Sequence, residues 1–251
     1  MSHIDGLIDL LNSNDQNTRA EAAADLFDKG HEAVEPLVHA LVDHRPRVRT
    51  AAVFVLGRIG DLDGEVISRL AATLGDQAEE VRDQAVNVMT QIGAKAVPLI
   101  LPWLMDDNLE AMACAAVALG RIGPTAQESL PSLLNLLDHQ APSVRTQSAI
   151  AAGKVGVGHY DKLIAMLNEA IQRQDDVRSE SLVIAIGESR VKNNDAIFAL
   201  MLAYMECSGQ AREKAMKYIK YIDPTLTPRD ISNELDPPRW WNQRMKSRDD
   251  N

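Results

Sequence analysis

Apolar residues recur along this chain at the spacing of one face of a helix. In residues 48–60, Val48, Ala52, Leu56 and Ile59 are separated by four, four and three positions. This spacing predicts a helix that buries one face and ends at Gly60, because glycine commonly follows the last helical residue. The pattern returns in the stretches that begin at Val81-Arg82, Val144-Arg145 and Val177-Arg178, and its closing residues return at 119–123.

A second, shorter apolar pattern precedes each of these helices. It covers residues 33–41, 65–74, 96–104 and 129–137, and proline stands early in three of these segments, at Pro36, Pro98 and Pro131. Proline is tolerated in the first turn of a helix, so each segment is predicted to be the first helix of a pair. The turn to the second helix is expected at an aspartate in each case: Asp43, Asp76, Asp106 and Asp138.

The closing glycines show that the helix pairs repeat at a nearly fixed period. Gly30, Gly60, Gly93, Gly123 and Gly156 are 30, 33, 30 and 33 residues apart. A period in this range is typical of stacked repeats, so we expect an all-α solenoid of about seven two-helix repeats over residues 1–223. A helical cap and tail are expected over 224–251. Each closing glycine is expected to have a left-handed backbone, and Ala52, Ala85, Ala115 and Ala149 are expected at the tightest helix contacts.

The pattern V-R-x-x-A-x-x-x-L-G-x-I-G, followed by A-V-x-P-L, resembles the short HEAT-like repeats of phycobilisome chromophore lyases. The resemblance covers about residues 1–223 and implies a right-handed, armadillo-like superhelix. It also implies a ladder of ion pairs between turn aspartates and the arginines of neighbouring repeats. Those arginines would be Arg19, Arg49, Arg82, Arg145, Arg178 and Arg212, and repeat 4 departs from the pattern because Met112 stands in this place. This repeat type serves many unrelated functions.

The composition narrows the classes of partner. The formal charge is −10, which disfavours a general nucleic-acid binder because phosphate contacts need clustered Lys and Arg. Residues 210–251 differ, with 9 basic and 7 acidic residues. Cys114 and Cys207 are expected to be small buried side chains. No signal-peptide pattern is present, and the apolar runs 96–105 and 197–205 are too short for a bilayer span, so we expect a cytoplasmic protein without membrane insertion.

The outward positions of the second helices are the first candidate site. Six residues after each Val position the expected groove side chains are Phe54, Asn87, Val117 and Ile150, and ten residues after it they are Arg58, Gln91, Arg121 and Lys154. An apolar row beside a weakly basic row suits a partner helix or an acidic peptide. The alternative is that these are ordinary solvated positions of the repeat, or that the predicted facing of Phe54 is wrong.

A second candidate lies near the C-terminus, where aromatic and basic residues alternate: Tyr218, Tyr221, Arg239, Trp240, Trp241 and Arg244. Such residues can stack on a planar ligand or on bases. They can equally form a lid over the open end of the stacked repeats, where an apolar face has to be covered. Both interpretations stay open at this point.

No catalytic constellation is recognisable. The six histidines lack metal-ligand spacing, and the glycine-rich residues 153–158 follow a helix and coincide with the end of a repeat. We therefore expect no cofactor and no catalytic residue. The expected function is that of a scaffold that binds another protein or peptide. The alternatives are a bilin lyase or its chaperone-like subunit and, through the basic C-terminal end, nucleic-acid binding. Nothing in the pattern predicts an oligomeric state.

Overall fold

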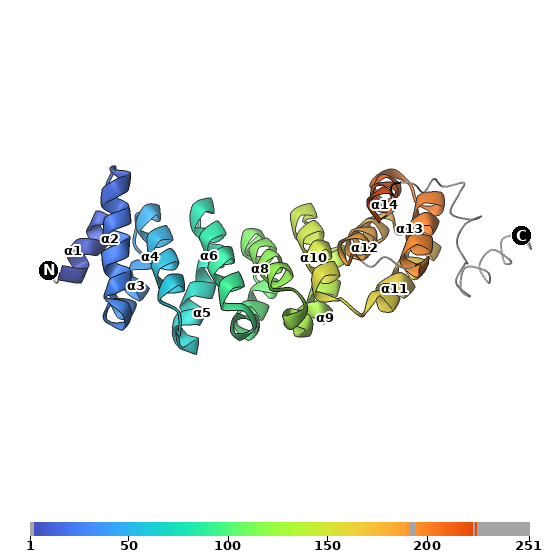
Figure 1. The fold of residues 1–251 in the computed structure, drawn as a ribbon. Coiled ribbons are helices and arrows are strands. Elements are labelled where there is room, and N and C mark those ends of the chain that lie inside the picture. Colours follow the sequence, from blue (N-terminus) through green and yellow to red (C-terminus); the bar gives the residue numbers. More distant parts are fainter. Residues whose placement is uncertain (1–2, 191–193, 223, 225–251) are drawn as a thin grey trace, which may run out of the picture. The chain divides into compact units, whose positions relative to one another are not determined.

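The computed structural model describes residues 3–190, 194–222 and 224. These residues form α-helices joined by short 3-10 helices and turns, with no strand among them, which confirms the predicted all-α fold class. The α-helices contact each other in consecutive pairs, from α1 with α2 to α13 with α14 (Figure 1). The packing divides the chain into two compact units, residues 1–126 and 127–251.

The N-terminal unit contains repeats 1 to 4. Its second helices pack in order, α2 on α4, α4 on α6 and α6 on α8, while the first helices α1 and α3, and α5 and α7, pack in a second layer. The α-helices are α1 (His3–Leu10), α2 (Gln16–Asp28), α3 (Val34–Ala40), α4 (Pro46–Ile59), α5 (Gly64–Ala72), α6 (Glu79–Ile92), α7 (Val97–Ile100) and α8 (Leu109–Ile122). The 3-10 helices are η1 (Gly30–Ala33), η2 (Thr73–Gly75), η3 (Gly93–Ala96) and η4 (Leu101–Met105).

The C-terminal unit contains repeats 5 to 7 and has the same layering. The second helices α10, α12 and α14 pack in order, and α11 packs on α13. Its helices are α9 (Leu130–Asn135), η6 (Leu136–Asp138), α10 (Pro142–Val155), α11 (Tyr160–Gln172), α12 (Asp176–Glu188), α13 (Asn194–Glu206) and α14 (Gly209–Ile222), and η5 (Gly123–Ser129) precedes them. The predicted cap over 224–251 lies outside the described residues apart from Pro224, so this part of the domain division stays a prediction.

The predicted buried face of the second helices is confirmed for most positions. Val48, Ala52 and Leu56 on α4 are fully buried, and so are the alanines predicted at the tightest contacts in the other repeats: Ala85, Ala115 and Ala149. Ile59 is only half-buried, contrary to the prediction, because it is the last residue of α4 and the chain leaves the layer there. Two second helices begin at a proline, α4 at Pro46 and α10 at Pro142.

The closing glycines follow the prediction in four repeats and depart from it in the fifth. Gly60, Gly93 and Gly123 end α4, α6 and α8 with φ of 64°, 70° and 75°, where a side chain would be strained, and Gly30 has φ 56°. Gly156 has φ −80° instead, and the positive φ occurs two residues later at Gly158. The turn before α11 therefore has a different backbone conformation from the turns that follow α4, α6 and α8.

Glycines inside the second helices allow close helix approach, a role that the hydrophobic pattern does not predict. A Cβ atom at Gly57 would overlap Val88 of the next second helix, α6. A Cβ at Gly153 would overlap the carbonyl of Ala185 on α12, and one at Gly187 would overlap the ring of Tyr218 on α14. These glycines set the spacing of neighbouring repeats inside each unit.

The turn between the two helices of a repeat is held by one recurring hydrogen bond. The side chain at the first turn position accepts from the backbone N–H two residues later, at 2.8 Å for Asp43, Asp76 and Asp106. Ser13 and His139 make the same bond in repeats 1 and 5, at 3.1 Å. The predicted turn residue of repeat 5, Asp138, is thus one position too early, and its carboxylate accepts from Arg178.

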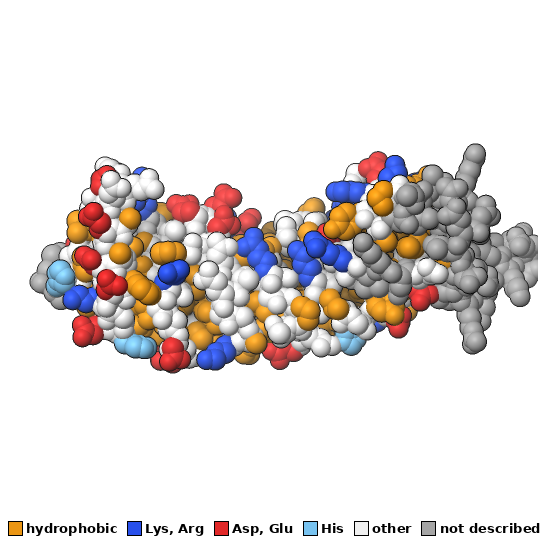
Figure 2. Space-filling model, in the orientation of Figure 1, with side chains coloured by type: hydrophobic (Ala, Val, Ile, Leu, Met, Phe, Trp, Pro, Cys, Tyr) orange, Lys and Arg blue, Asp and Glu red, His pale blue; other side chains and the backbone are white. Residues whose placement is uncertain are grey.

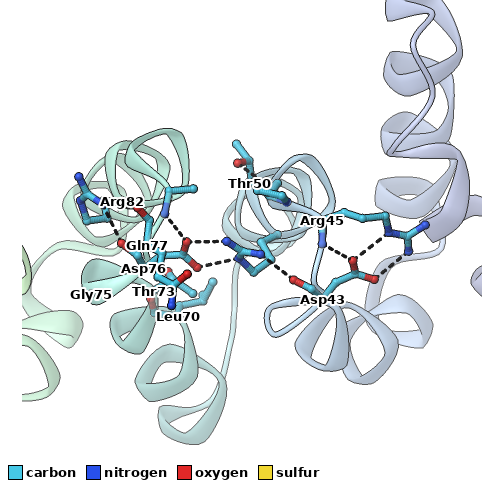
Figure 3. Close-up of polar contacts among 12 residues, drawn as sticks. Asp43, Arg45, Thr50, Leu70, Thr73, Gly75, Asp76, Gln77 and Arg82 are labelled. Atoms are coloured by element: carbon cyan, nitrogen blue, oxygen red, sulfur yellow. Dashed lines mark hydrogen bonds and ion pairs between the residues drawn. The ribbon is translucent and has the colours of Figure 1, made fainter.

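The implied ladder of ion pairs is confirmed between Arg49 and Asp76, whose guanidinium and carboxylate make two contacts of 2.7 Å (Figure 3). Elsewhere the ladder prediction is mostly wrong. Arg82 reaches its nearest carboxylate, Glu110, at only 3.8 Å, and Arg212 lies over the ring of Tyr204 at 4.9 Å. Arg178 does pair with Asp138, the predicted turn aspartate of the preceding repeat, so this second contact of the ladder is confirmed.

The arginines of repeats 1, 2, 3 and 5 share another contact, a hydrogen bond to the backbone of their own turns. In each of Arg19, Arg49, Arg82 and Arg145, here called the turn arginines, Nη1 donates to the carbonyl six residues before it, at 2.7 to 2.8 Å. In all but Arg49 it also donates to the following carbonyl. Turn carbonyls have no partner within a helix, so these bonds satisfy acceptors that the fold leaves open.

One helical stretch, Glu79–Met105, has the length and composition to cross a membrane. It is not one helix, because α6 ends at Gly93 with φ 70° and the stretch continues as η3, α7 and η4. It consists of the second helix of one repeat and the first helix of the next, both packed within the N-terminal unit.

The two cysteines are free, with Cys207 buried as expected and Cys114 only half-buried.

Candidate functional site

The second helices of repeats 1 and 2 carry exposed aromatic rings. Phe54 on α4 is 47% exposed, so the predicted outward facing is confirmed, and Phe27 on α2 is 41% exposed. The guanidinium of Arg58 lies 5.7 Å from the centre of the Phe27 ring, within the range of a cation–π contact. We call Phe27, Phe54 and Arg58 the aromatic surface. Figure 2 shows apolar side chains beside a basic one over α2 and α4.

Two predicted residues of repeats 3 and 4 are brought together. Nη1 of Arg121 on α8 donates to Oδ1 of Asn87 on α6 at 2.9 Å, and both side chains are exposed. Gln91 is also exposed, whereas Val117 is half-buried and offers less contact area than predicted. The face thus changes from aromatic over α2 and α4 to polar over α6 and α8.

Ile150 and Lys154 lie on α10 in the C-terminal unit, and both are half-buried. Ile150 was predicted as part of an outward apolar row, and its burial makes it partly a packing residue. Lys154 keeps part of its side chain accessible to solvent.

The described part of the second candidate, Tyr218 and Tyr221, lies on α14. The Tyr218 hydroxyl donates to Glu188 at 3.0 Å, and burial, together with the charge of Glu188, raises the pKa of this hydroxyl. Tyr221 is 58% exposed. A cavity of about 250 Å³ is lined by Gly187, Glu188, Arg190, Lys217, Tyr218 and Tyr221. The other predicted members, Arg239, Trp240, Trp241 and Arg244, lie outside the described residues.

A larger cavity, of about 520 Å³, lies at the turn edge of repeats 2 and 3. Val42, which is 86% exposed, and the ion-paired residues Arg49 and Asp76 are among its lining. Hydrogen bonding from Arg45, above all, lowers the pKa of Asp43 to about 2, and the bond to Asp76 raises the pKa of Arg49. Because these charges are already paired with each other, the polar side chains that line this cavity stabilise the turns of the fold.

Phe27 is the functional candidate that the sequence analysis missed. It lies outside the V-R register, nine residues after Thr18, so counting six and ten positions passes over it. The available signal was a large aromatic between Asp25 and Asp28, where the helical period places a polar face.

In residues 3–190, 194–222 and 224, no group of three His, Cys, Asp or Glu side chains is placed to hold a metal ion.

A family model for HEAT repeats matches residues 4–88 and 67–152, which together cover more than half of the sequence. The chain therefore belongs to the HEAT repeat family.

A protein described as the uncharacterized phycocyanin operon protein Z, from Pseudanabaena tenuis (strain PCC 7409), is 30% identical over 123 residues. The match covers 46% of this chain and 60% of that relative, so the chain spans less than two thirds of it.

Among solved structures, the chain is similar to one described by the binding of Kap95p to RanGDP, with a TM-score of 0.57 and 14% identity. That match covers 89% of this chain and 36% of the other, and it supports the fold alone. The chain is also similar to the complex of CpcE and CpcF of phycocyanin lyase from Nostoc sp. PCC7120, with a TM-score of 0.41 and 19% identity. That match covers 88% of this chain and 95% of the other.

Proposed function

We propose that this protein is a non-enzymatic scaffold that binds a partner protein or peptide on the second-helix face of its N-terminal unit. The observation that carries the proposal is the aromatic surface: two phenylalanine rings, 41% and 47% exposed, on helices that pack against each other. Aromatic residues and arginine are enriched at the centres of protein interfaces. Exposure of two such rings to water is unfavourable, and the packing of the repeats does not require it.

The contact between Arg58 and Phe27 prepares this surface for binding. A guanidinium 5.7 Å from the ring centre holds both side chains in one arrangement before the partner arrives. Side chains that are ordered in advance lose less conformational entropy on association. The surface therefore offers an apolar anchor with a positive charge at its edge.

The neighbouring residues indicate the chemistry of the partner. Arg121 and Asn87 are already hydrogen-bonded to each other on α8 and α6, and Gln91 adds an exposed amide. A partner that places an apolar side chain between Phe27 and Phe54 can extend carboxylates and backbone groups over α6 and α8. We expect an extended or helical segment of mixed apolar and acidic character.

The test is affinity capture with the wild-type chain and with the variants Phe54→Asp and Phe27→Asp. We expect each variant to lose the partners that depend on the aromatic surface, because a carboxylate on an apolar anchor has to be desolvated on binding. Val42→Asp is the matched control, since Val42 is 86% exposed in the same unit but lies at the turn edge. Identical partner profiles for all four proteins would contradict the proposal.

The alternative, a bilin lyase or its chaperone-like subunit, is supported by the similarity to the phycocyanin operon protein. The cavity beside α14 could take part in holding a planar acidic pigment, because Tyr218 and Tyr221 line it together with Arg190 and Lys217. Mixing the protein with free bilin and recording visible absorbance tests this, and an unshifted spectrum would argue against it. A cytoplasmic location stays a prediction from the sequence.

A further inference from the structure

The turn of repeat 4 presents apolar side chains to solvent. Met105, the last residue of η4, is 84% exposed, and Leu109, the first residue of α8, is 44% exposed. Between and beside them lie the acidic residues Asp106, Asp107 and Glu110. We call these five residues the repeat 4 turn surface. Two exposed aliphatic side chains on one short turn are more than solvation of a turn requires.

This turn also lacks the arginine that holds the corresponding turns. Arg82 donates to the carbonyls of Asp76 and Gln77 at 2.8 and 3.0 Å, and Arg145 donates to those of His139 and Gln140 at 2.8 and 2.9 Å. Met112 takes this position in repeat 4, and its side chain is buried. In the described part of the chain, no arginine donates to the equivalent carbonyls, which belong to Asp106 and Asp107.

The charge of this surface is negative. Oδ1 of Asp106 accepts from the backbone N–H of Asn108 at 2.8 Å, so its charge is hydrogen-bonded but not paired with a cation. Glu110 is 65% exposed, and the nearest cation, Arg82, is 3.8 Å away, which is too far for a hydrogen bond. Three carboxylates thus flank two apolar side chains, and the complementary ligand is both basic and apolar.

From this geometry we infer that the repeat 4 turn surface binds a partner segment that carries an arginine next to an aliphatic side chain. The partner's guanidinium donates to the carbonyls of Asp106 and Asp107, as the protein's own turn arginines do in other repeats. Its aliphatic neighbour packs on Met105 and Leu109. Arginine fits better than lysine, because its planar group can donate to two acceptors at once. This inference does not depend on the aromatic surface.

The experiment measures fluorescence anisotropy of short labelled peptides with the full chain. The probe contains Leu-Arg-Leu-Arg between Gly-Ser ends, and matched peptides replace both arginines by lysine or by glutamate. We expect the arginine peptide to bind most tightly and the glutamate peptide most weakly. Met112→Arg is expected to weaken the arginine peptide about tenfold, because the chain's own guanidinium then occupies the two carbonyls. Met105→Ser should weaken it about fivefold through lost apolar contact.

Two controls keep the result specific. Val42→Ser removes an exposed aliphatic side chain from the turn of repeat 2, and Phe54→Asp alters the aromatic surface, so neither should change the affinity for the peptide. If Met112→Arg does not fold, as judged by circular dichroism, Met105→Ser and Asp107→Asn provide the same test at exposed positions. Equal binding of the arginine and glutamate peptides would overturn the inference. So would unchanged affinity in the folded variants at 105, 107 and 112, or a loss of binding in Phe54→Asp.

Discussion

The turns of repeats 3 and 4 are neighbours in the N-terminal unit, yet different contacts hold them. In repeat 3, Asp76 receives the guanidinium of Arg49 from one side, and its carbonyl accepts from Arg82 (Figure 3). In repeat 4, the corresponding arginine is replaced by Met112, and the Asn108 side chain donates to the carbonyl of Gly75 at 3.2 Å. The comparison shows that residues kept from repeat to repeat stabilise the turns. Where repeat 4 departs from this pattern, Met112 is buried in the place of the arginine, and the described residues provide no guanidinium for the carbonyls of Asp106 and Asp107.

The largest expected effect is the loss of the ion pair on the repeat 3 side. Arg49→Ala should lower the free energy of unfolding by about 3 kcal/mol, because the side chains of Arg49 and Asp76 are only 13% and 11% exposed. Removing the arginine leaves a largely buried carboxylate without its partner. Urea unfolding measures this change. Arg47→Ala is the control: Arg47 is exposed and its guanidinium donates to the exposed Asn14 side chain at 3.1 Å, so a change of about 0.5 kcal/mol or less is expected.

A smaller effect is expected from acid. The pKa of Asp43 is lowered from 3.8 to about 2, chiefly by the hydrogen bond from Arg45. Because the folded pKa is the lower one, the stabilisation is fully present above about pH 4 and is lost as the pH falls towards 2. It amounts to about 2 kcal/mol, and the side chain is only 17% exposed, so solvent screens it little.

The measurement is the difference in unfolding free energy between wild type and Asp43→Asn at pH 5, 3 and 2. This difference should shrink as the pH falls. Asp107→Asn, at an exposed position in the turn of repeat 4, serves as the control for the same chemical change in another turn. A difference for Asp43→Asn that does not change with pH would show that the ionised carboxylate contributes little.

Restoring the recurring residue in repeat 4 should change stability less. Met112→Arg gains hydrogen bonds to two turn carbonyls and loses the burial of a methionine that is only 5% exposed. These contributions oppose each other, so we expect a net change within about 1 kcal/mol in either direction. A loss well beyond this range in thermal unfolding would mean that the repeat 4 turn cannot accept the arginine, and that the two turns differ in more than one side chain.

The smallest effect on stability is expected on the aromatic surface. Phe54→Ser should change the free energy of unfolding by about 0.5 kcal/mol or less, since the side chain is 47% exposed and lies outside the core of α4. Leu56→Ser, two residues away, is the contrast: Leu56 is fully buried, and its replacement should cost several kcal/mol. Similar losses in both variants would show that Phe54 packs as a core residue.

The recurring features of the sequence predicted the fold well, because they follow from helix period and packing. The spacing of Val48, Ala52 and Leu56 identified the buried face of α4, and the glycine period identified the helix pairs. The turn contacts were less predictable. A guanidinium near a turn can reach a carboxylate of the next repeat or a carbonyl of its own, and spacing along the chain does not decide between them.

The candidate site was only partly predictable for a similar reason. Phe54 and Arg58 follow the repeat register and were identified, whereas Phe27 lies outside that register and was found only from its exposure. The hydrogen bond between Arg121 and Asn87 depends on how α6 and α8 are rotated. Val117, Ile150 and Lys154 are half-buried, although the helical period alone places them outward.

The most direct test of the central claim, that the aromatic surface binds a partner, is photo-crosslinking in the cell of origin. A benzophenone amino acid replaces Phe54 in one protein and Val157, which is 52% exposed in the C-terminal unit, in another. We predict a discrete cross-linked protein with the probe at position 54 that is absent with the probe at 157 and is lost when Phe27→Asp is added. The same cross-linked products at both positions, or none at position 54, would contradict the account.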